Sequence, residues 1–337
     1  MKKTRNRPFF VCIRKKICYN IGMKSVNGNG KNNEGLGSLF GEATPAKASG
    51  IAFSLATVLP VGLSILFLIA TALLGLAQGD YESQDWYLYS SFLLPQIGFA
   101  IVAFWYLRYR KISIKRAVFS QKCHYKYFII AFLLQVGLLC LAELNVWFLE
   151  WLGKFGYTDK GIALPSMDGW GFIGVLLVVG VFPAVFEEII FRGVLFDGLK
   201  KSFSLPVAVL VCGGLFALYH QNPAQTLYQF CCGAAFALVA VKSGSVLPTV
   251  FSHFLNNAFI VVLYKLRIET FAPTVFAVIM CASALCLIGS IGYLVFVDKT
   301  KTERKKETGG GKRFFLYAAV GIVVCALTWA LVLLMGM

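Results

Sequence analysis

The sequence predicts an all-α fold, a polytopic transmembrane helix bundle of about eight to nine spans. Of the 337 residues, 58% are hydrophobic and only 14% are charged, whereas soluble proteins are nearer half apolar and a quarter charged. The mean hydropathy is +0.72, and apolar runs long enough to cross a bilayer as helices recur along the chain. Together these features exclude a soluble enzyme, a disordered chain and a disulfide-stapled secreted module.

The first 49 residues contain no apolar run of spanning length. They carry ten basic and two acidic residues, and we expect a disordered cytoplasmic arm that attracts anionic lipid. Nine candidate spans follow, of which the fourth is long and the fifth is short. They cover residues 51–77, 88–107, 128–150, 169–198, 205–221, 224–242, 246–264, 271–297 and 314–336.

The chain divides into three predicted parts. Residues 1–49 form the arm, residues 50–298 a transmembrane domain, and residues 299–337 a basic loop with an additional C-terminal helix. Whether 205–221 and 224–242 both cross the membrane, or form a re-entrant pair, is left open by the sequence.

Charge orients the predicted spans. The net charge of +16 could indicate nucleic acid, but the loop 108–127 holds seven bases and no acid, whereas the loop 78–87 holds three acids and no base. Alternating through nine spans, 28 of the 32 Lys and Arg residues fall on one side. Because positive charge is retained in the cytoplasm, the sequence predicts a cytoplasmic N-terminus, an external C-terminus and no nucleic-acid partner.

The cysteines and one histidine carry little functional information. No C-x-x-C motif occurs among the ten Cys residues, and most lie within apolar spans, where free Cys acts as a small hydrophobe. His124 lies in the basic loop without a carboxylate neighbour, and we expect it to be solvated.

Ionisable side chains inside spans indicate function, because charges in a bilayer are costly. In the fourth span, Glu188 and Arg192 are four residues apart and can pair on one helix face. Glu187 points about 100° away from Glu188, so this pairing leaves it free. An unpaired carboxylate in an apolar setting suits a general acid or base.

Two histidines add to this carboxylate from other spans. His220 closes the fifth span, and His253 lies in the seventh, four residues before Asn257 and on the same face. A glutamate can take a proton from water, a histidine can orient that water, and a His–Asn pair can hold an oxyanion. No serine nucleophile elbow, H-E-x-x-H zinc helix or phosphate loop is present.

The three motifs resemble those of a known family. Glu187-Glu188-x-x-x-Arg192, Phe216-x-x-x-His220 and His253-x-x-x-Asn257, in this order, look like the motifs of the CPBP intramembrane glutamic endopeptidases. This family contains the type II CAAX prenyl endopeptidases and the bacterial ABI, or self-immunity, proteins. The resemblance covers a helical core from about 130 to 265.

The resemblance implies an intramembrane peptidase without a cofactor or required metal, in a bacterial cell membrane. Glu187 and His220 would activate water, His253 and Asn257 would form the oxyanion site, and Glu188 and Arg192 would shape it. The implied substrate is a peptide or protein at the membrane, such as a lipidated protein or a bacteriocin-like precursor.

Two alternatives remain open from the residues. Glu187, His220 and His253 could instead bind zinc as a His₂Glu set, or the chain could be a non-catalytic immunity or scaffold protein. One geometric tension also remains, since His220 lies ~23 Å from the start of its span. Either the fourth helix extends beyond the predicted span, or the fifth starts deeper or breaks near Gly213-Gly214.

Overall fold

The structure is a computed structural model that describes residues 43–113, 123–159, 161–268, 270–300 and 306–337. Most of the predicted arm and parts of two basic loops therefore lie outside the described residues. Within the described part, helices are present and strands are absent. The first half contains α2 (Pro45–Leu73), η1 (Tyr81–Ser83), α3 (Asp85–Tyr109), α4 (Lys126–Leu138), η3 (Leu139–Leu141) and α5 (Ala142–Gly153).

The second half contains the segments that carry the motifs, and it includes three π-helical turns labelled η4, η5 and η7. These elements are α6 (Gly171–Val175), η4 (Leu176–Val181), α7 (Phe182–Glu188), η5 (Ile189–Leu195), α8 (Phe196–Ser202), α9 (Leu205–Tyr219), η6 (Pro223–Gln225), α10 (Thr226–Ser243), α11 (Leu247–Lys265), α12 (Pro273–Gly292), η7 (Tyr293–Val297) and α13 (Gly310–Met335).

Eight helical segments of the described chain are long and apolar enough to cross a membrane. The prediction of an all-α polytopic bundle is therefore confirmed. The segments agree with the predicted spans, although the first begins earlier, at Pro45, where Thr44 caps the helix. The exception is α9, which has 15 residues and is shorter than the other apolar helices.

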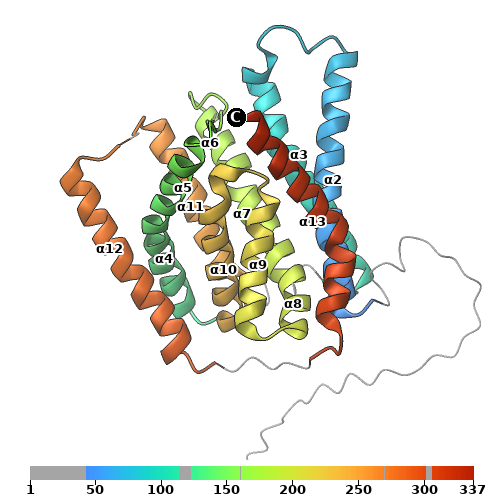
Figure 1. Ribbon diagram of the computed structural model, residues 1–337, viewed down its shortest axis with the longest axis vertical. Helices are drawn as coiled ribbons and strands as arrows, with labels where there is room; N and C mark the ends of the chain where they lie inside the picture. The colour runs from blue at the N-terminus through green and yellow to red at the C-terminus, as the bar shows by residue number, and fades with distance from the viewer. Residues whose placement is uncertain (1–42, 114–122, 160, 269, 301–305) are drawn as a thin grey trace, which may run out of the picture. The chain divides into compact units, whose positions relative to one another are not determined.

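The C-terminal helix α13 packs along α2, as Figure 1 shows. Two glycines permit this close approach, because a Cβ on Gly50 would meet the Phe314 carbonyl oxygen at 2.5 Å and one on Gly321 would meet Cα of Ser54 at 2.9 Å. The hydroxyl of Ser54 also donates to the Tyr317 carbonyl at 2.7 Å. The helix that lies outside the predicted motif core is thus packed into the same bundle.

Helices α9 and α10 lie side by side (Figure 1), and they approach closely at Gly213 and Gly233. A Cβ on Gly213 would lie 2.8 Å from the Phe230 carbonyl oxygen and 2.9 Å from the Ala234 backbone nitrogen. Backbone atoms cannot move aside as a flexible side chain can. The neighbouring Gly214, by contrast, has nothing within 4 Å of its Cβ position.

We therefore expect Gly213→Ala to destabilise the protein by about 1–3 kcal/mol, the usual effect of overpacking. Gly214→Ala is the matched control, and it should be neutral or stabilising by up to ~1 kcal/mol, because alanine favours the helix. Thermal unfolding in detergent measures both variants. Equal melting temperatures for the two would contradict the close contact.

Hydrogen bonds gather the loops and helix termini at two ends of the bundle. At one end, which we call the basic end, Arg110 donates to the Ala43 carbonyl at 2.7 Å, and the backbone nitrogen of Glu307 donates to the Lys201 carbonyl at 2.9 Å. Lys242 likewise donates to the Asp298 carbonyl at 2.6 Å. These residues belong to segments that charge counting places on one side of the membrane.

The opposite end collects the other predicted loops. The backbone nitrogen of Ser166 donates to Asp85 at 2.7 Å, Lys265 donates to the Met167 carbonyl at 2.8 Å, and Thr158 donates to the Gly336 carbonyl at 2.8 Å. Figure 1 shows the C-terminus at this end, near α6. The charge pattern and the fold therefore divide the described loops in the same way.

Asp298 directly follows η7, and it links this end of the eighth predicted span to α4 at the basic end. Its carboxylate accepts hydrogen bonds from Tyr127 at 2.8 Å and from the backbone nitrogen of Thr300 at 2.9 Å, and it lies 3.6 Å from the ammonium of Lys126. Burial alone would raise the pKa of this carboxyl, but the hydrogen bonds and the Lys126 charge outweigh it and lower the pKa from 3.8 to about 2.

A carboxyl with a lowered pKa stabilises the fold above its unfolded pKa and loses this effect as the pH falls through its folded value. We therefore expect wild type to melt above Asp298→Asn by a constant margin at neutral pH. The margin should shrink as the pH falls below 3.8 toward about 2. Melting curves of both proteins across this range test the expectation, and a margin that grows on acidification would contradict it.

Candidate active site

The fourth spanning segment, Gly171–Ser202, carries the first motif and departs from regular α-helix on both sides of it. The π-helical segment η4 precedes α7, and η5 follows it. Single π turns often occur at functional sites, because they redirect side chains within a helix. Glu187 and Glu188 end α7, and Arg192 lies in η5.

Pro183 contributes a second local irregularity to this segment. Proline has no N–H, so it cannot donate to the carbonyl four residues earlier, that of Val179. The side-chain amide of Asn257, on α11, donates to this carbonyl instead, at 2.9 Å. The sequence of the fourth span thus creates the acceptor that positions the last residue of the third motif.

Glu188 and Arg192 form the ion pair that their spacing predicts. Nη1 of Arg192 lies 2.8 Å from Oε1 of Glu188, and neither side chain is exposed. Arg192 also donates to the Gly233 carbonyl at 3.2 Å, and its guanidinium stacks over the Phe216 ring at 4.4 Å. The pair therefore sits in a hydrophobic enclosure and joins the fourth span to α9 and α10.

His253, in α11, bonds to the same carboxylate. Its Nδ1 lies 2.9 Å from Oε1 of Glu188. Because this oxygen also accepts from Arg192, the carboxylate is the acceptor and Nδ1 of His253 carries the proton. Nε2 of His253 then faces Glu187, whose Oε2 lies 3.9 Å away, which is too long for a direct hydrogen bond.

Glu187 is buried, and its Oε2 has no hydrogen-bond partner among the described residues. Buried polar atoms nearly always find a partner, so this orphaned oxygen needs a water or a substrate group. The spacing argument is confirmed for the ion pair, since Arg192 pairs with Glu188, whereas Glu187 has Nε2 of His253 at 3.9 Å.

His220 follows the last residue of α9 and is tied to its own helix. Its Nδ1 lies 2.8 Å from the Phe216 carbonyl oxygen, and since a carbonyl only accepts, Nδ1 is the donor. In the neutral ring, Nε2 is then an acceptor. The Phe216 ring contacts both imidazoles, with centroid distances of 4.7 Å to His220 and 6.0 Å to His253.

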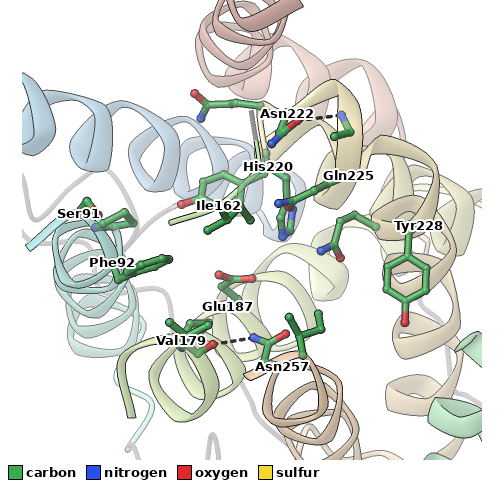
Figure 2. A pocket seen from close by; sticks show the side chains of 18 of the residues that line it. Ser91, Phe92, Ile162, Val179, Glu187, His220, Asn222, Gln225, Tyr228 and Asn257 are labelled. Carbon is green, nitrogen blue, oxygen red and sulfur yellow. Dashed lines mark hydrogen bonds between the residues drawn. The ribbon is translucent and has the colours of Figure 1, made fainter. Parts of the chain in front are cut away.

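A cavity of about 960 Å³ joins the residues of the three motifs. Glu187, His220, His253 and Asn257 all line it, whereas Glu188 and Arg192 lie behind its wall. Figure 2 shows the side chains of Glu187 and His220 pointing into the same space, with Asn257 beside Glu187. Four of the six predicted site residues therefore share one cavity, and the other two support it.

The predicted spans placed His220 and Glu187 at different depths, but in the structure both side chains line the same cavity. The fourth segment extends to Ser202, beyond the predicted boundary at 198, so that Glu187 lies near its middle. Helix α9 is continuous through Gly213-Gly214. The expected break near Gly213-Gly214 is therefore wrong, and the longer fourth segment agrees with the first of the two geometric solutions expected from the sequence.

A buried amide network beside the third motif was missed by sequence reasoning. Oδ1 of Asn256 accepts from Gln135 at 2.9 Å and from the Tyr228 hydroxyl at 2.8 Å, and its Nδ2 donates to Asn257 at 3.0 Å. A glutamine in the otherwise apolar α4 was a signal available in the sequence, since polar residues within spans need partners. The network holds the Asn257 side chain from the side opposite Val179.

Metal binding receives no support from side-chain clustering. Within the described ranges, no group of three or more His, Cys, Asp or Glu side chains is arranged to hold a metal ion. His220 and His253 each use Nδ1 within the protein, which leaves only their Nε2 atoms facing the cavity. His124, which we expected to be solvated, lies outside this site and hydrogen-bonds the backbone nitrogen of Lys126.

The comparison with protein families decides the relationship. A family model described as type II CAAX prenyl endopeptidase Rce1-like matches residues 169–259. Over these residues the chain is similar to the Rce1-like family. The match contains all three motifs and extends from α6 into α11. The predicted resemblance is confirmed.

The Rce1-like match assigns the segment to a family of membrane endopeptidases of the CAAX type. A peptide or protein substrate at the membrane follows from this class. Comparison with curated proteins gave no match, and comparison with solved structures gave none either.

Proposed function

We propose that the chain is an intramembrane endopeptidase that uses Glu187 to activate water. The observation that carries the proposal is the buried carboxylate of Glu187, which lines a cavity shared with two histidines and whose Oε2 has no hydrogen-bond partner among the described residues. A general base must lie within hydrogen-bond reach of the water that it deprotonates. Nε2 of His253 lies 3.9 Å from Oε2 of Glu187, and His220 lines the same cavity, so these two imidazoles are the groups offered to such a water.

In the proposed reaction, Glu187 accepts a proton from water while Nε2 of His220 accepts the second hydrogen bond and orients the molecule. The water oxygen bonds to the carbonyl carbon of the substrate. Glu187 then gives its proton to the amide nitrogen and the C–N bond breaks, which leaves a carboxylic acid and an amine. Transfer of the acid proton to the amine gives the carboxylate and ammonium products.

His253 and Asn257 are proposed to stabilise the oxyanion. Asn257 has two amide hydrogens, of which one goes to the Val179 carbonyl, so the second is free for the substrate. His253 would donate from Nε2 in its doubly protonated form, with Nδ1 held by Glu188. Donors aimed at a developing charge typically contribute a factor of about 10²–10³ to the rate.

The test is a comparison of the peptide termini in membranes that contain wild type or Glu187→Ala. New N-termini that depend on Glu187 would identify the cleavage sites directly. A non-catalytic immunity or scaffold protein predicts instead that both membranes yield the same termini and that the biological effect survives in the variant.

We further propose that the reaction requires no metal. Cleavage by the purified protein should persist after prolonged treatment with a strong chelator. Loss of cleavage that is restored by stoichiometric zinc would overturn this proposal and support a zinc-dependent peptidase in which the same three residues bind the ion.

A further inference from the structure

The residues that line the cavity come from the halves of the surrounding helices that lie nearer one end of the bundle. Helix α2 supplies Pro60 and residues toward its C-terminus, α3 supplies residues near its N-terminus, and α11 supplies His253 and residues beyond it. The loop between α5 and α6 supplies Ile162, which Figure 2 shows across the cavity from Val179. All of these parts face the end opposite the basic end.

The half of the bundle nearer the basic end is closed. A Cβ on Gly198 would lie 2.3 Å from the Ser49 hydroxyl and 2.8 Å from the Pro45 carbonyl oxygen, so α8 and α2 touch there. Between the α2–α8 contact and the candidate active site lie fully buried aromatic side chains, among them Phe53, Phe99 and Phe191. Along the described chain, this packing separates the cavity from the basic end.

The charge on the two ends orients the cavity. The basic end carries the bases that the positive-inside rule assigns to the cytoplasm, such as Lys200, Lys201 and Arg313. The opposite end carries the acidic loop that contains Asp80 and Glu82. A cavity closed toward the basic end therefore faces away from the cytoplasm.

The lining indicates how a peptide would bind. No Lys or Arg side chain is among the described residues that line the cavity, whereas amides are frequent and Asp159 adds a negative charge. Apart from the His253 imidazolium proposed to hold the oxyanion, a free C-terminal carboxylate near the scissile bond would find no cation among the described lining residues. The amide groups of Gln225, Asn222 and Gln229 suit instead the hydrogen-bonding groups of a peptide backbone.

From these observations we infer that the enzyme cuts an internal peptide bond that reaches the site from the extracytoplasmic side of the membrane. Its substrate class is an exported or membrane-anchored polypeptide. The cut would lie in an uncharged or basic segment of that polypeptide, close to the extracytoplasmic surface of the membrane. This inference rests on the proposed peptidase function and adds the side of the membrane from which the substrate enters.

Cysteine accessibility tests the orientation without any catalysis. Ile162→Cys places a thiol at the exposed rim of the cavity, and Lys299→Cys places one at the exposed basic end. In intact bacterial cells, a membrane-impermeant polyethylene-glycol maleimide should add one more label to Ile162→Cys than to the parent protein. The extra label is seen as a slower band on a denaturing gel. Lys299→Cys should gain its extra adduct only after permeabilisation. The reverse pattern would overturn the inference.

A second measurement separates this inference from the proposed function. Cleavage sites that depend on Glu187 should map to extracytoplasmic segments of exported or anchored proteins. Sites that map to cytoplasmic segments would overturn the inference and leave the peptidase intact. Absence of any Glu187-dependent site would instead remove the peptidase function, and the substrate inferred here with it, while the labelling pattern still decides the orientation.

Discussion

Glu187→Gln is expected to reduce peptide-bond cleavage by about 10²- to 10⁴-fold, the usual contribution of a positioned general acid or base. Glutamine has nearly the same shape as glutamate, so the packing around this buried position is preserved. It cannot accept a proton from water at neutral pH. The initial rate of cleavage, measured on a substrate found by comparing membrane peptide termini, gives the size of the effect.

Glu150→Gln is the matched control for this variant, because Glu150 is a carboxylate of α5 that is exposed and outside the cavity lining. It should retain wild-type cleavage. Both variants should melt at nearly the wild-type temperature. Full activity in Glu187→Gln would contradict the proposed mechanism, and a large fall in melting temperature would assign Glu187 a structural role instead.

Arg192→Ala is expected to destabilise the fold by about 3–5 kcal/mol, since removing one partner leaves a buried charge uncompensated. Glu188 has no exposed side-chain surface, and without Arg192 it would lose the cation that compensates its charge while keeping the bond to His253 at 2.9 Å. The guanidinium also fills the space beside the Phe216 and Phe236 rings. Denaturant or thermal unfolding in detergent measures the loss.

Lys201→Ala provides the matched control for this pair. Lys201 and Asp197 have the same i,i+4 spacing as Arg192 and Glu188, but both side chains are about one third exposed. Exposed ion pairs contribute little, so the control should lose less than about 1 kcal/mol. Similar losses in the two variants would show that burial does not set the strength of the Glu188–Arg192 pair.

Arg192→Lys separates the charge from the shape of the side chain. Lysine keeps the positive charge, but its single ammonium cannot reproduce the planar fork that contacts both Glu188 and the Gly233 carbonyl. We expect a stability between those of wild type and Arg192→Ala.

Local sequence rules predicted much of the site. The spacing of Glu188 and Arg192 predicted their pairing and left Glu187 as the free carboxylate, because i,i+4 neighbours share a helix face. Because ionisable side chains are costly inside a bilayer, the position of His253 within a span indicated a functional role. These rules depend on the helix and the bilayer alone, so they hold without knowledge of the packing.

Contacts between helices could not be predicted in this way. The bond from His253 to Glu188, the donation from Asn257 to the Val179 carbonyl and the support from Gln135 each join residues more than 60 positions apart. Their partners depend on the crossing of helices at points such as Gly213 and Gly233, and no periodicity within one span encodes that geometry.

By itself, the sequence determined that this protein is a membrane bundle with one basic side and a few ionisable residues inside its spans. Hydrophobicity and charge determine these properties residue by residue. Only the tertiary structure decided that Glu187, His220 and His253 share a cavity, that Glu188 is neutralised from two helices, and that the cavity is closed toward the basic end. These outcomes depend on close packing in three dimensions, where a single glycine decides how near two helices can lie.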